Sequence, residues 1–294
     1  MSKAETVAPD VRRILAPNPS ALTFQGTNTY LIGSGEVAVI DPGPDSPQHL
    51  EAMLAALGLD DRVSAILVTH AHLDHSGLAA RLQQETGAPI YAAGTATDGR
   101  SPTMQALADS GLIGGGEGLD MAFVPDHRLA HGQVVAGRTW ELEAIATPGH
   151  LGSHMAFRFE DVVFSGDHVM GWSTTIVSPP DGDMGAYMAS LERLARVDAR
   201  LYLPGHGPEI ETPSTRVSEL VQHRRARESA ILNVLRAGPA TAVDVAAAVY
   251  TDVAPELVPA ATRNVLAHLI DLCEKGLGAC EGPISVGATF HLSR

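Results

Sequence analysis

The chain has 294 residues, about twice the usual size of a single domain, so one large domain or two domains are expected. Its hydrophobic fraction of 45% and charged fraction of 18% are typical of a folded protein and exclude a disordered one. A formal charge of −14 and an aromatic content of 4% are unfavourable for non-specific polyanion binding and for stacked-base recognition along an extended surface.

Short apolar runs and helical stripes alternate along the first two-thirds of the chain. The β-branched run 63–68 is typical of a buried strand, and the spacing of Leu50, Met53 and Leu57 predicts a helix over 46–57. A second helix, with Leu78 and Leu82 on its apolar side, is expected after that strand. This alternation predicts an α/β architecture of packed layers. The other expected elements are strands at 29–33, 36–40, 90–93, 140–146, 155–159, 162–164 and 201–203, and a helix at 184–197.

The segment 94–118 is rich in Gly and Ser, with Gly114, Gly115 and Gly116 at its centre. A loop of this length inside a compact domain is often a functional lid, and we expect one here. The glycines do not match a nucleotide-binding fingerprint, because no strand leads directly into them and no Lys-Ser or Lys-Thr follows.

The composition changes after about residue 212. Helical stripes at 217–235, 241–249 and 259–275 replace the strand signals, and a hairpin is expected over 279–292. This is the order of a winged helix, although a small helical cap has a similar pattern. We therefore expect two domains, residues 1–212 and residues 213–294. The first carries 12 basic and 26 acidic residues and the second eight of each, so the acidity of the chain belongs to the first domain.

A cluster of three histidines and an aspartate follows the strand at 63–68. His70, His72, Asp74 and His75 fall within six residues, and alternation places His70 and His72 on the same side of an extended segment. The chain has 13 histidines, and neutral imidazole and carboxylate are the ligands that zinc and similar divalent metals prefer. The cluster therefore predicts a metal site.

Three further segments place a ligand-type residue after an apolar strand and a glycine-bearing turn. His150 ends the sequence Thr-Pro-Gly-His, Asp167 ends Ser-Gly-Asp, and His206 lies within Pro-Gly-His-Gly. The glycines let the backbone pass close to a crowded ion. Together with the first cluster these residues make seven candidate ligands, enough for two metal ions with open positions for water.

This set of motifs resembles the metallo-β-lactamase-fold hydrolases over residues 17–208. The resemblance implies a four-layered αββα fold, here followed by a small winged-helix-like domain. It also implies two Zn²⁺ ions per chain, with iron or manganese as alternatives, and a metal-bound hydroxide as the nucleophile. The implied ligands are His70, His72 and His150 for a first metal, Asp74, His75 and His206 for a second, and Asp167 as the bridge between them.

Finer motifs resemble the β-lactamase-like protein 2 group, whose members carry a C-terminal winged helix. These motifs are the Gly-Thr-Asn-Thr-Tyr of residues 26–30 and the sequence around His206, continued by His223-Arg224. That group includes a mitochondrial endoribonuclease alongside bacterial proteins of unassigned substrate. We therefore expect a binuclear metal-dependent hydrolase whose substrate is not assigned, with single-stranded RNA as one candidate. The alternative substrate is a small acyl compound, namely a thioester, a lactone or a β-lactam. An Asp at the bridging position resembles glyoxalase II and ribonuclease Z more than many true β-lactamases.

Catalysis requires groups beyond the metal ligands. His168 and His154 are the candidates for a general acid, and a structural role explains each of them equally well. Asp74 is a further catalytic candidate. Asp41, at the end of a predicted strand, is expected to orient a metal-ligating imidazole or a backbone turn.

Substrate contacts are expected from Asn28, Thr29 and Arg224. A turn explains Asn28 and Thr29 equally well. Arg224 lies in the basic run 223–227, for which a solvated helix face is the alternative to a phosphate contact. The helix at 259–275 is poor in basic residues, so no duplex DNA is expected as a partner. The expected substrate is a small molecule or single-stranded RNA. The expected protein partner is a second copy of the chain, in a homodimer.

Two features of the sequence predict a cytoplasmic location. Cys273 and Cys280 are too few for a disulfide scaffold, and the N-terminal residues show no signal peptide. No apolar run is long enough to span a bilayer, so no membrane association is expected.

Overall fold

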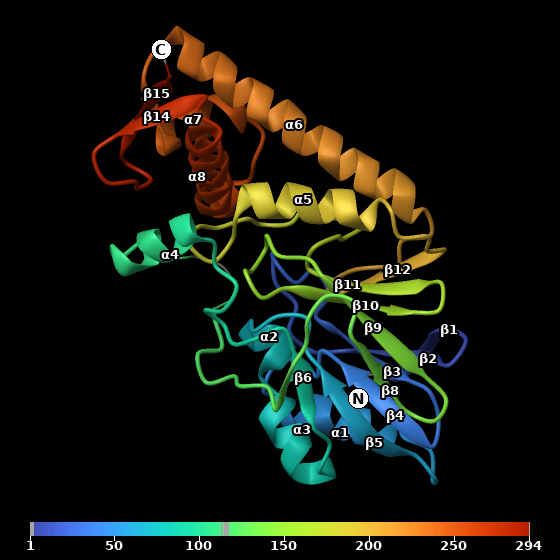
Figure 1. The fold of residues 1–294 in the computed structure, drawn as a ribbon. Helices are drawn as coiled ribbons and strands as arrows, with labels where there is room; N and C mark the ends of the chain where they lie inside the picture. The colour runs from blue at the N-terminus through green and yellow to red at the C-terminus, as the bar shows by residue number, and fades with distance from the viewer. Residues whose placement is uncertain (1–2, 113, 115–117, 294) are drawn as a thin grey trace.

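The computed structural model describes residues 3–112, 114 and 118–293 and contains two β-sheets that face each other (Figure 1). The first sheet consists, in spatial order, of β1 (Glu5–Ala8), β2 (Val11–Leu15), β3 (Asn28–Ile32), β4 (Glu36–Ile40), β5 (Arg62–Leu67), β6 (Ile90–Ala92) and β7 (His127–Arg128). The second consists, in spatial order, of β12 (Leu201–Pro204), β11 (Val162–Gly166), β10 (Met155–Phe159), β9 (Glu141–Ala146) and β8 (Val134–Ala136).

Helices cover the outer faces of both sheets. Helices α1 (Pro47–Ala55) and α3 (Ala79–Thr86) pack on the first sheet, and α5 (Met184–Leu194) packs on the second (Figure 1). The short helix α2 (Leu73–Ser76) leads from β5 toward α3. The predicted four-layered αββα fold is therefore confirmed.

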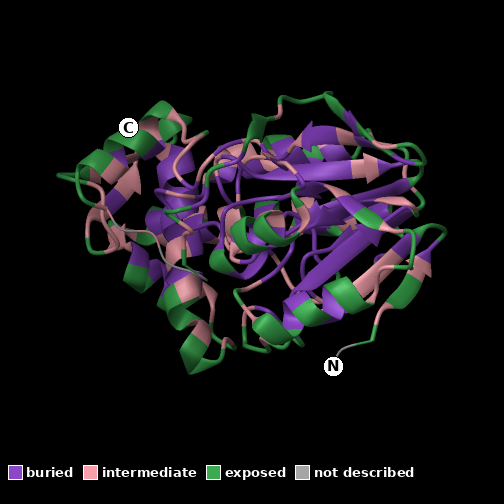
Figure 2. Cartoon of the chain, turned by 90° about the horizontal axis from the view of Figure 1, so that it is seen from below, coloured by how far each residue is buried: buried purple, intermediate pink, exposed green. Residues whose placement is uncertain are grey.

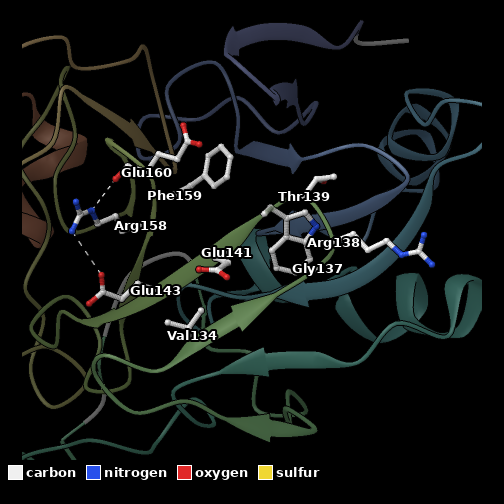
Figure 3. A pocket seen from close by; sticks show the side chains of 10 residues that line it. Val134, Gly137, Arg138, Thr139, Glu141, Glu143, Arg158, Phe159 and Glu160 are labelled. Atoms are coloured by element: carbon white, nitrogen blue, oxygen red, sulfur yellow. Dashed lines mark hydrogen bonds and ion pairs between the residues drawn. The ribbon is translucent and has the colours of Figure 1, made fainter.

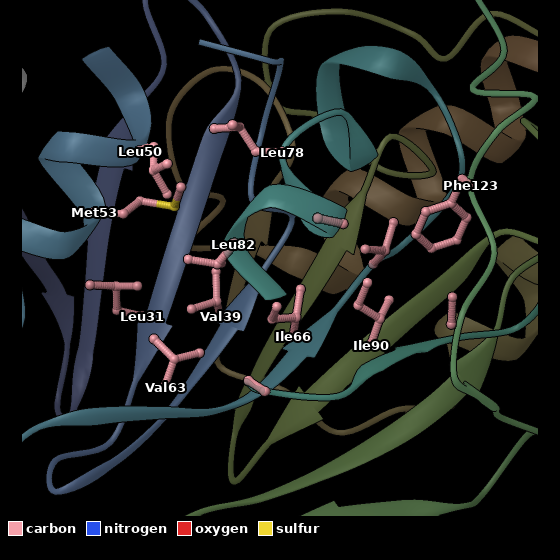
Figure 4. Packing of buried hydrophobic residues seen from close by; sticks show 14 of the residues in the cluster. Leu31, Val39, Leu50, Met53, Val63, Ile66, Leu78, Leu82, Ile90 and Phe123 are labelled. Atoms are coloured by element: carbon pink, nitrogen blue, oxygen red, sulfur yellow. The ribbon is translucent and has the colours of Figure 1, made fainter. Parts of the chain in front are cut away.

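Apolar side chains fill the spaces between these layers. Phe157 and Phe164 lie between the two sheets, whereas Leu31 and Ile66 pack on the other side of the first sheet with Leu82 of α3 (Figure 4). Because both faces of each sheet are covered, the central strands are buried along most of their length (Figure 2). This explains why they appear in the sequence as near-continuous apolar runs.

The C-terminal part is a winged helix, as predicted. Its three-stranded sheet has the order β13-β15-β14, and the long first helix lies across α5 (Figure 1). Thr241 begins the second helix with a capping box, because its hydroxyl oxygen accepts from the Asp244 N–H while the Asp244 carboxylate accepts from the Thr241 N–H. The elements are α6 (Pro213–Ala237), β13 (Ala240–Thr241), α7 (Ala242–Val249), the 3₁₀ turn η1 (Pro255–Leu257), α8 (Val258–Glu274), β14 (Gly278–Glu281) and β15 (Thr289–Leu292).

The segment 94–118, expected to be a loop, differs from the prediction. It contains helix α4 (Pro102–Asp109), which begins at the cap Ser101 and buries Met104 and Leu107 against the winged helix. The helix forms because this apolar pair has a partner surface that the local sequence does not reveal. Gly115 and Gly116 lie outside the described residues. Strands β1, β2, β7 and β8 were also missed, since they are short and three of them, β1, β7 and β8, lie at sheet edges.

Strand direction brings the predicted motifs to one end of the sandwich. Strands β4, β5 and β6 run parallel in the first sheet, and β11 and β12 run parallel in the second. Strand β9 runs in the same direction as β11, because both are antiparallel to β10. The segments that follow β5, β9, β11 and β12 therefore meet at the same edge. In the part of the chain described here, no helix has both the length and the hydropathy needed to cross a membrane.

Candidate metal centre

Seven side chains with ligand-type atoms converge at this edge. We call His70, His72 and His150 the first triad, and Asp74, His75 and His206 the second triad. Donor atoms within 4.8 Å of one another define both triads and also a third set, His70 with His75 and Asp167. The third set joins the other two, so all seven predicted ligands belong to one connected cluster.

Local backbone structure explains how the first four side chains reach the cluster. His70 lies in extended chain just beyond β5, and His72 is the N-cap of α2, so Asp74 and His75 lie in the first turn of that helix. The N–H of Leu73 donates to the Gly118 carbonyl at 3.1 Å, which holds the segment against the following loop. His75 has no exposed surface, whereas 11% of the His150 side chain is exposed. The cluster therefore opens to solvent on the side of His150.

The donor set fits a divalent cation. Nε2 of His70 lies 2.9 Å from Nδ1 of His72, so the two ring nitrogens face each other and only one proton can lie between them. The Oδ1 atoms of Asp74 and Asp167 are buried and have no hydrogen-bond partner among the described residues. A buried carboxylate oxygen without a partner is costly. A cation bound at the cluster would satisfy the unpaired Asp167 oxygen and the facing nitrogens together.

The first triad holds neutral imidazoles. Burial lowers the pKa of His72 to about 3, and burial together with the neighbouring imidazoles lowers the pKa of His70 well below its ordinary value. Burial also lowers the pKa of His150, although Asp167 opposes it. Neutral imidazole is the form that binds metal, so these three rings need not lose a proton first.

The second triad is charged. Burial lowers the pKa of His206, but the Asp167 carboxylate outweighs it and raises that pKa to about 10. Burial likewise opposes the charged form of His75, whereas Asp74, Asp167 and Asp41 together raise its pKa well above the ordinary value. Burial would raise the pKa of Asp167, but His206 and His75 hold it well below the usual range. The second triad thus carries protons that a metal ion would have to displace.

Asp41 supports the second triad through a hydrogen bond with His75. Its Oδ2 lies 2.8 Å from His75 Nδ1 and accepts from the Thr69 hydroxyl at 2.7 Å, while Oδ1 accepts from the Thr69 N–H at 2.7 Å. The residue has a φ of 50°, a left-handed conformation that is unusual for Asp and is kept here by these contacts. The predicted orienting role of Asp41 matches this geometry. Thr69 was not predicted, although it directly precedes the histidine cluster.

Glycine is required where strands end beside the ligands. A Cβ atom on Gly205 would lie 2.4 Å from Asp167 Oδ1 and 2.6 Å from His75 Cε1. A Cβ atom on Gly166, whose φ is 50°, would lie 2.7 Å from His154 Nε2. Any larger residue would displace a candidate ligand or its support, which is the close approach that the sequence predicted.

The side chains of Asn28 and Thr29 donate hydrogen bonds to backbone carbonyl groups. The Asn28 amide donates to the carbonyls of Pro204 and Gly207 at 3.0 and 2.9 Å and so fixes the turn that carries His206. The Thr29 hydroxyl donates to the Asp41 carbonyl at 2.6 Å and is fully buried. The turn alternative therefore fits both residues, and the expected substrate contact of Thr29 stays a prediction that its burial does not support.

The two histidines expected to supply a general acid are both buried. His154 Nε2 accepts from the Asp167 N–H at 3.2 Å, and its Nδ1 lies 2.8 Å from the Thr147 hydroxyl. Neither ring nitrogen of His168 has a hydrogen-bond partner among the described residues, and burial lowers its pKa to about 3. A ring that stays neutral and has no route to solvent is a poor proton donor at neutral pH. Both residues fit the structural alternative instead.

Arg224 is also corrected by the structure. Its side chain is 1% exposed, and its guanidinium donates to the Thr175 carbonyl and lies 5.1 Å from the centre of the Tyr187 ring. Its charge faces the interior between α6 and the segment around Thr175, where a phosphate group cannot reach it. The structure therefore supports neither the phosphate contact nor the solvated helix face.

A groove of about 490 Å³ adjoins the turn that carries His206, lined there by Asn28 and Gly207. Phe24 and Trp172 line it as well, with ring centroids 5.0 Å apart at an angle of 25°, and Phe24 is 42% exposed. No sequence motif pointed to these two aromatic residues. The other lining residues include Lys3, Glu5, Arg13, Leu15 and Pro208.

A second hollow, of about 580 Å³, lies where β9 begins and β10 ends, at the other end of these strands from the candidate centre (Figure 3). It is lined by Glu141 at the start of β9 and Phe159 at the end of β10, whereas His150 follows the end of β9. Its Arg158 lies 3.9 Å from Glu143, as the dashed line in Figure 3 shows. None of the ligand sets found among the described residues includes its side chains, so it is separate from the candidate centre.

Comparisons with known proteins match both parts of the chain. The family model "Metallo-beta-lactamase superfamily" matches residues 22–206, and "Beta-lactamase associated winged helix domain" matches residues 241–280. These segments lie on either side of the boundary expected near residue 212, and the boundary itself stays a prediction. A metallo-beta-lactamase family protein from Thermus thermophilus superimposes with a TM-score of 0.77 at 26% identity, over 98% of this chain and 100% of that one.

Curated relatives agree with this assignment. The "Beta-lactamase-like protein 2 homolog" of Drosophila melanogaster is 33% identical over 277 residues, which are 90% of this chain and 88% of the relative. A protein of Aspergillus fumigatus named "Atrochrysone carboxyl ACP thioesterase" is 31% identical over 241 residues, 80% of this chain and 68% of the relative.

Proposed function

This chain belongs to the metallo-beta-lactamase superfamily of hydrolases, and we propose that it is a binuclear zinc enzyme that hydrolyses a small acyl substrate, preferably a thioester. The observation that carries the proposal is the pair of buried triads joined by Asp167. Each triad would hold one metal, and Asp167 would bridge them. Its Oδ2 lies 3.3 Å from His206 Nε2 and 3.8 Å from His150 Nε2, one nitrogen from each triad, which supports the bridging role.

Two divalent cations at this site would lower the pKa of a water molecule and stabilise the negative charge that develops on the attacked carbonyl group. Asp74 has the geometry to handle the proton that this water loses. Its Oδ2 accepts from the Thr27 hydroxyl at 3.3 Å and lies 3.2 Å from His206 Nε2, whereas Oδ1 is buried without a partner among the described residues. Asp74 Oδ1 is thus the free acceptor, and this supports the predicted catalytic role of Asp74.

The side chains around the centre limit the kind of leaving group that the site can release. With His154 and His168 engaged in structural roles, neither is available to protonate a departing amine or alkoxide. A thiol has a pKa of about 8–9, so a thiolate leaves with little help from an acid. The site therefore suits a thioester better than an amide such as a β-lactam.

The groove supports the same substrate class. Leu15, Phe24, Trp172 and Pro208 give it apolar walls beside the turn that carries His206, where the acyl group of a substrate would lie. The thioesterase name of the Aspergillus fumigatus relative points to the same class of reaction, since that protein is 31% identical to this chain. Zinc remains the proposed metal because imidazole and carboxylate suit it, with iron or manganese as alternatives.

Single-stranded RNA is the second candidate substrate, and one observation favours it. The exposed Phe24 ring, stacked on Trp172, is a platform on which a base could stack, and Lys3 and Arg13 line the same groove. The burial of Arg224 removes the phosphate contact first expected for RNA. Arg13 is moreover paired with Glu5 and Glu209, at 2.7 and 3.0 Å.

The winged helix is not suited to duplex DNA. Helix α8, the helix before the wing, buries the run of eight residues from Val265 to Leu272 against neighbouring elements. A helix covered in this way cannot enter a groove of DNA. The absence of a duplex DNA partner and the homodimer stay predictions, as does the cytoplasmic location.

A substrate panel on the zinc-loaded protein tests the proposal. We expect hydrolysis of acyl thioesters, and we expect the Phe24→Ala variant to raise KM with little change in kcat, because the ring contacts the acyl group and not the reacting atoms. Leu59→Ala, which removes a fully exposed side chain in the turn after α1, is the matched control. Cleavage of RNA without thioester turnover would favour the second candidate, and no hydrolysis of either would contradict both.

A further inference from the structure

The segment between Asp167 and α5 contacts candidate ligands of both metals. The Thr175 hydroxyl donates to the backbone carbonyl of Asp167 at 2.6 Å. The carbonyl of the next residue, Ile176, lies 2.7 Å from Nδ1 of His150. Since a carbonyl only accepts, this contact places a proton on Nδ1 and leaves Nε2 of His150 as the nitrogen that faces His72, 3.2 Å away.

The same segment is held on its other side by the winged helix. Arg224 of α6 donates to the Thr175 carbonyl, and Asn264 of α8 accepts from the Val177 N–H at 3.0 Å. Arg224 also donates to the Asn264 side-chain oxygen at 3.3 Å, so the two residues form one unit. Both side chains are buried, with 1% and 8% exposed. The residues on either side of Ile176 are therefore fixed from the C-terminal domain.

From this geometry we propose that Arg224 and Asn264 are positioning residues of the metal centre, acting on His150 through the backbone of residues 175–177. The winged helix is then a structural part of the hydrolytic site, not a separate binding module. The inference rests on the proposed function, because it requires that the first triad hold a metal.

His150 depends on this support more than the other ligands do. It follows Gly149 in a loop, and it is the most exposed of the seven candidates, whereas His70 and His72 are fixed close behind β5. The second triad has supports of its own, since Asp41 contacts His75 and the Gly26 carbonyl lies 3.2 Å from His206 Nδ1. Loss of the Arg224–Asn264 unit should therefore weaken the first metal and spare the second.

The test is a zinc titration of the full-length chain against a chromophoric chelator, with metal content per chain measured in parallel. Partners that orient a ligating histidine change metal affinity by about 10- to 100-fold. We expect Arg224→Met to lower the affinity of one of the two zinc ions by that factor, and Arg224→Lys to restore part of it, because the ammonium group can still donate to the Thr175 carbonyl. The control Arg236→Met removes an exposed arginine from the same helix and should leave both affinities unchanged.

A second variant separates positioning from loss of fold. Asn264→Leu removes the acceptor for the Val177 N–H and should weaken the same zinc ion, whereas Asn264→Asp keeps the acceptor and should not. Circular dichroism identifies variants that remain folded. Two zinc ions bound with wild-type affinity by folded Arg224→Met and Asn264→Leu would overturn the inference and leave the proposed function intact. A wild-type protein that does not bind two metals would overturn both.

Discussion

Substitution of Asp41 by Asn should disable the second triad through a change of tautomer. The Asp41 carboxylate can only accept hydrogen bonds, so His75 must carry a proton on Nδ1, and Nε2 is the nitrogen that gives up its proton and binds metal. The Thr69 N–H donates to Asp41 Oδ1 at 2.7 Å, so in Asp41→Asn the amide oxygen takes this position. The amide NH₂ then replaces Oδ2 and faces His75. The imidazole then has to accept at Nδ1 and keep its proton on Nε2, the nitrogen that faces His206 and Asp167.

The hydrogen bonds that change in Asp41→Asn set the size of the expected effects on stability and on zinc affinity. Asp41 accepts three buried hydrogen bonds of 2.7–2.8 Å, and the two at Oδ2 lose their charged acceptor in the variant, where the neutral amide NH₂ takes its place. A hydrogen bond to a charged group contributes about 1.5–3 kcal/mol, so the free energy of unfolding of the metal-free protein should fall by about 2 kcal/mol. Zinc affinity at the second triad should fall by about 10- to 100-fold, or about 1.4–2.8 kcal/mol.

Two assays measure these effects. Chelator competition gives the affinity of each zinc ion. ¹⁵N NMR of the metal-free protein, at a pH where His75 has lost one of its two protons, reports which ring nitrogen keeps the other. Asp45→Asn makes the same chemical change four residues away on an exposed side chain and should alter neither result. Unchanged zinc affinity in Asp41→Asn, together with a proton still on Nδ1 of His75, would refute the reasoning.

The remaining predictions concern stability, packing and pH. His268 is 1% exposed, and burial holds its pKa at about 3, so its folded form stays neutral while the unfolded form gains a proton below about pH 6.5. His268 therefore contributes a loss of stability as the pH falls from about 6.5 toward 3, about 2 kcal/mol at pH 5, and in urea unfolding the loss should be smaller by that amount in His268→Leu than in the wild type. Gly205→Ala places a Cβ 2.4 Å from Asp167 Oδ1 and should lower the free energy of unfolding by about 1–3 kcal/mol, and a wild-type melting temperature would contradict the packing argument. Zinc binding at the second triad should release about two protons at pH 7.5, because the pKa values of His75 and His206 are raised. Calorimetry in two buffers of different ionisation enthalpy measures that number, and no proton release would exclude a charged second triad.

The ligand cluster could be predicted because its residues carry their own local signals. His70, His72, Asp74 and His75 are close in sequence, and each of the other ligands follows a strand and a glycine turn. Strand direction then brings them together, so chemistry and periodicity were sufficient. The support of His75 by Asp41 was also accessible, since a carboxylate at a strand end has few other roles.

Contacts between distant segments could not be predicted in the same way. Arg224 lies in a run of basic residues that is typical of a solvated helix face, yet α6 turns it toward Thr175, 49 residues earlier in the chain. His168 looks like an acid when only its place beside Asp167 is known, and its burial against Tyr187 is a result of how α5 packs. Helix α4 likewise forms on a surface that the winged helix provides. Burial of this kind depends on the whole fold, which one sequence does not reveal.

The central claim is that seven side chains hold two metal ions that the hydrolysis requires. It is tested most directly by the rate of thioester hydrolysis measured as zinc is added stepwise to metal-depleted protein. The account predicts no turnover without metal and a rate that stops rising at two zinc ions per chain. Full activity in the metal-depleted protein, or a rate that stops rising at one zinc ion, would contradict it.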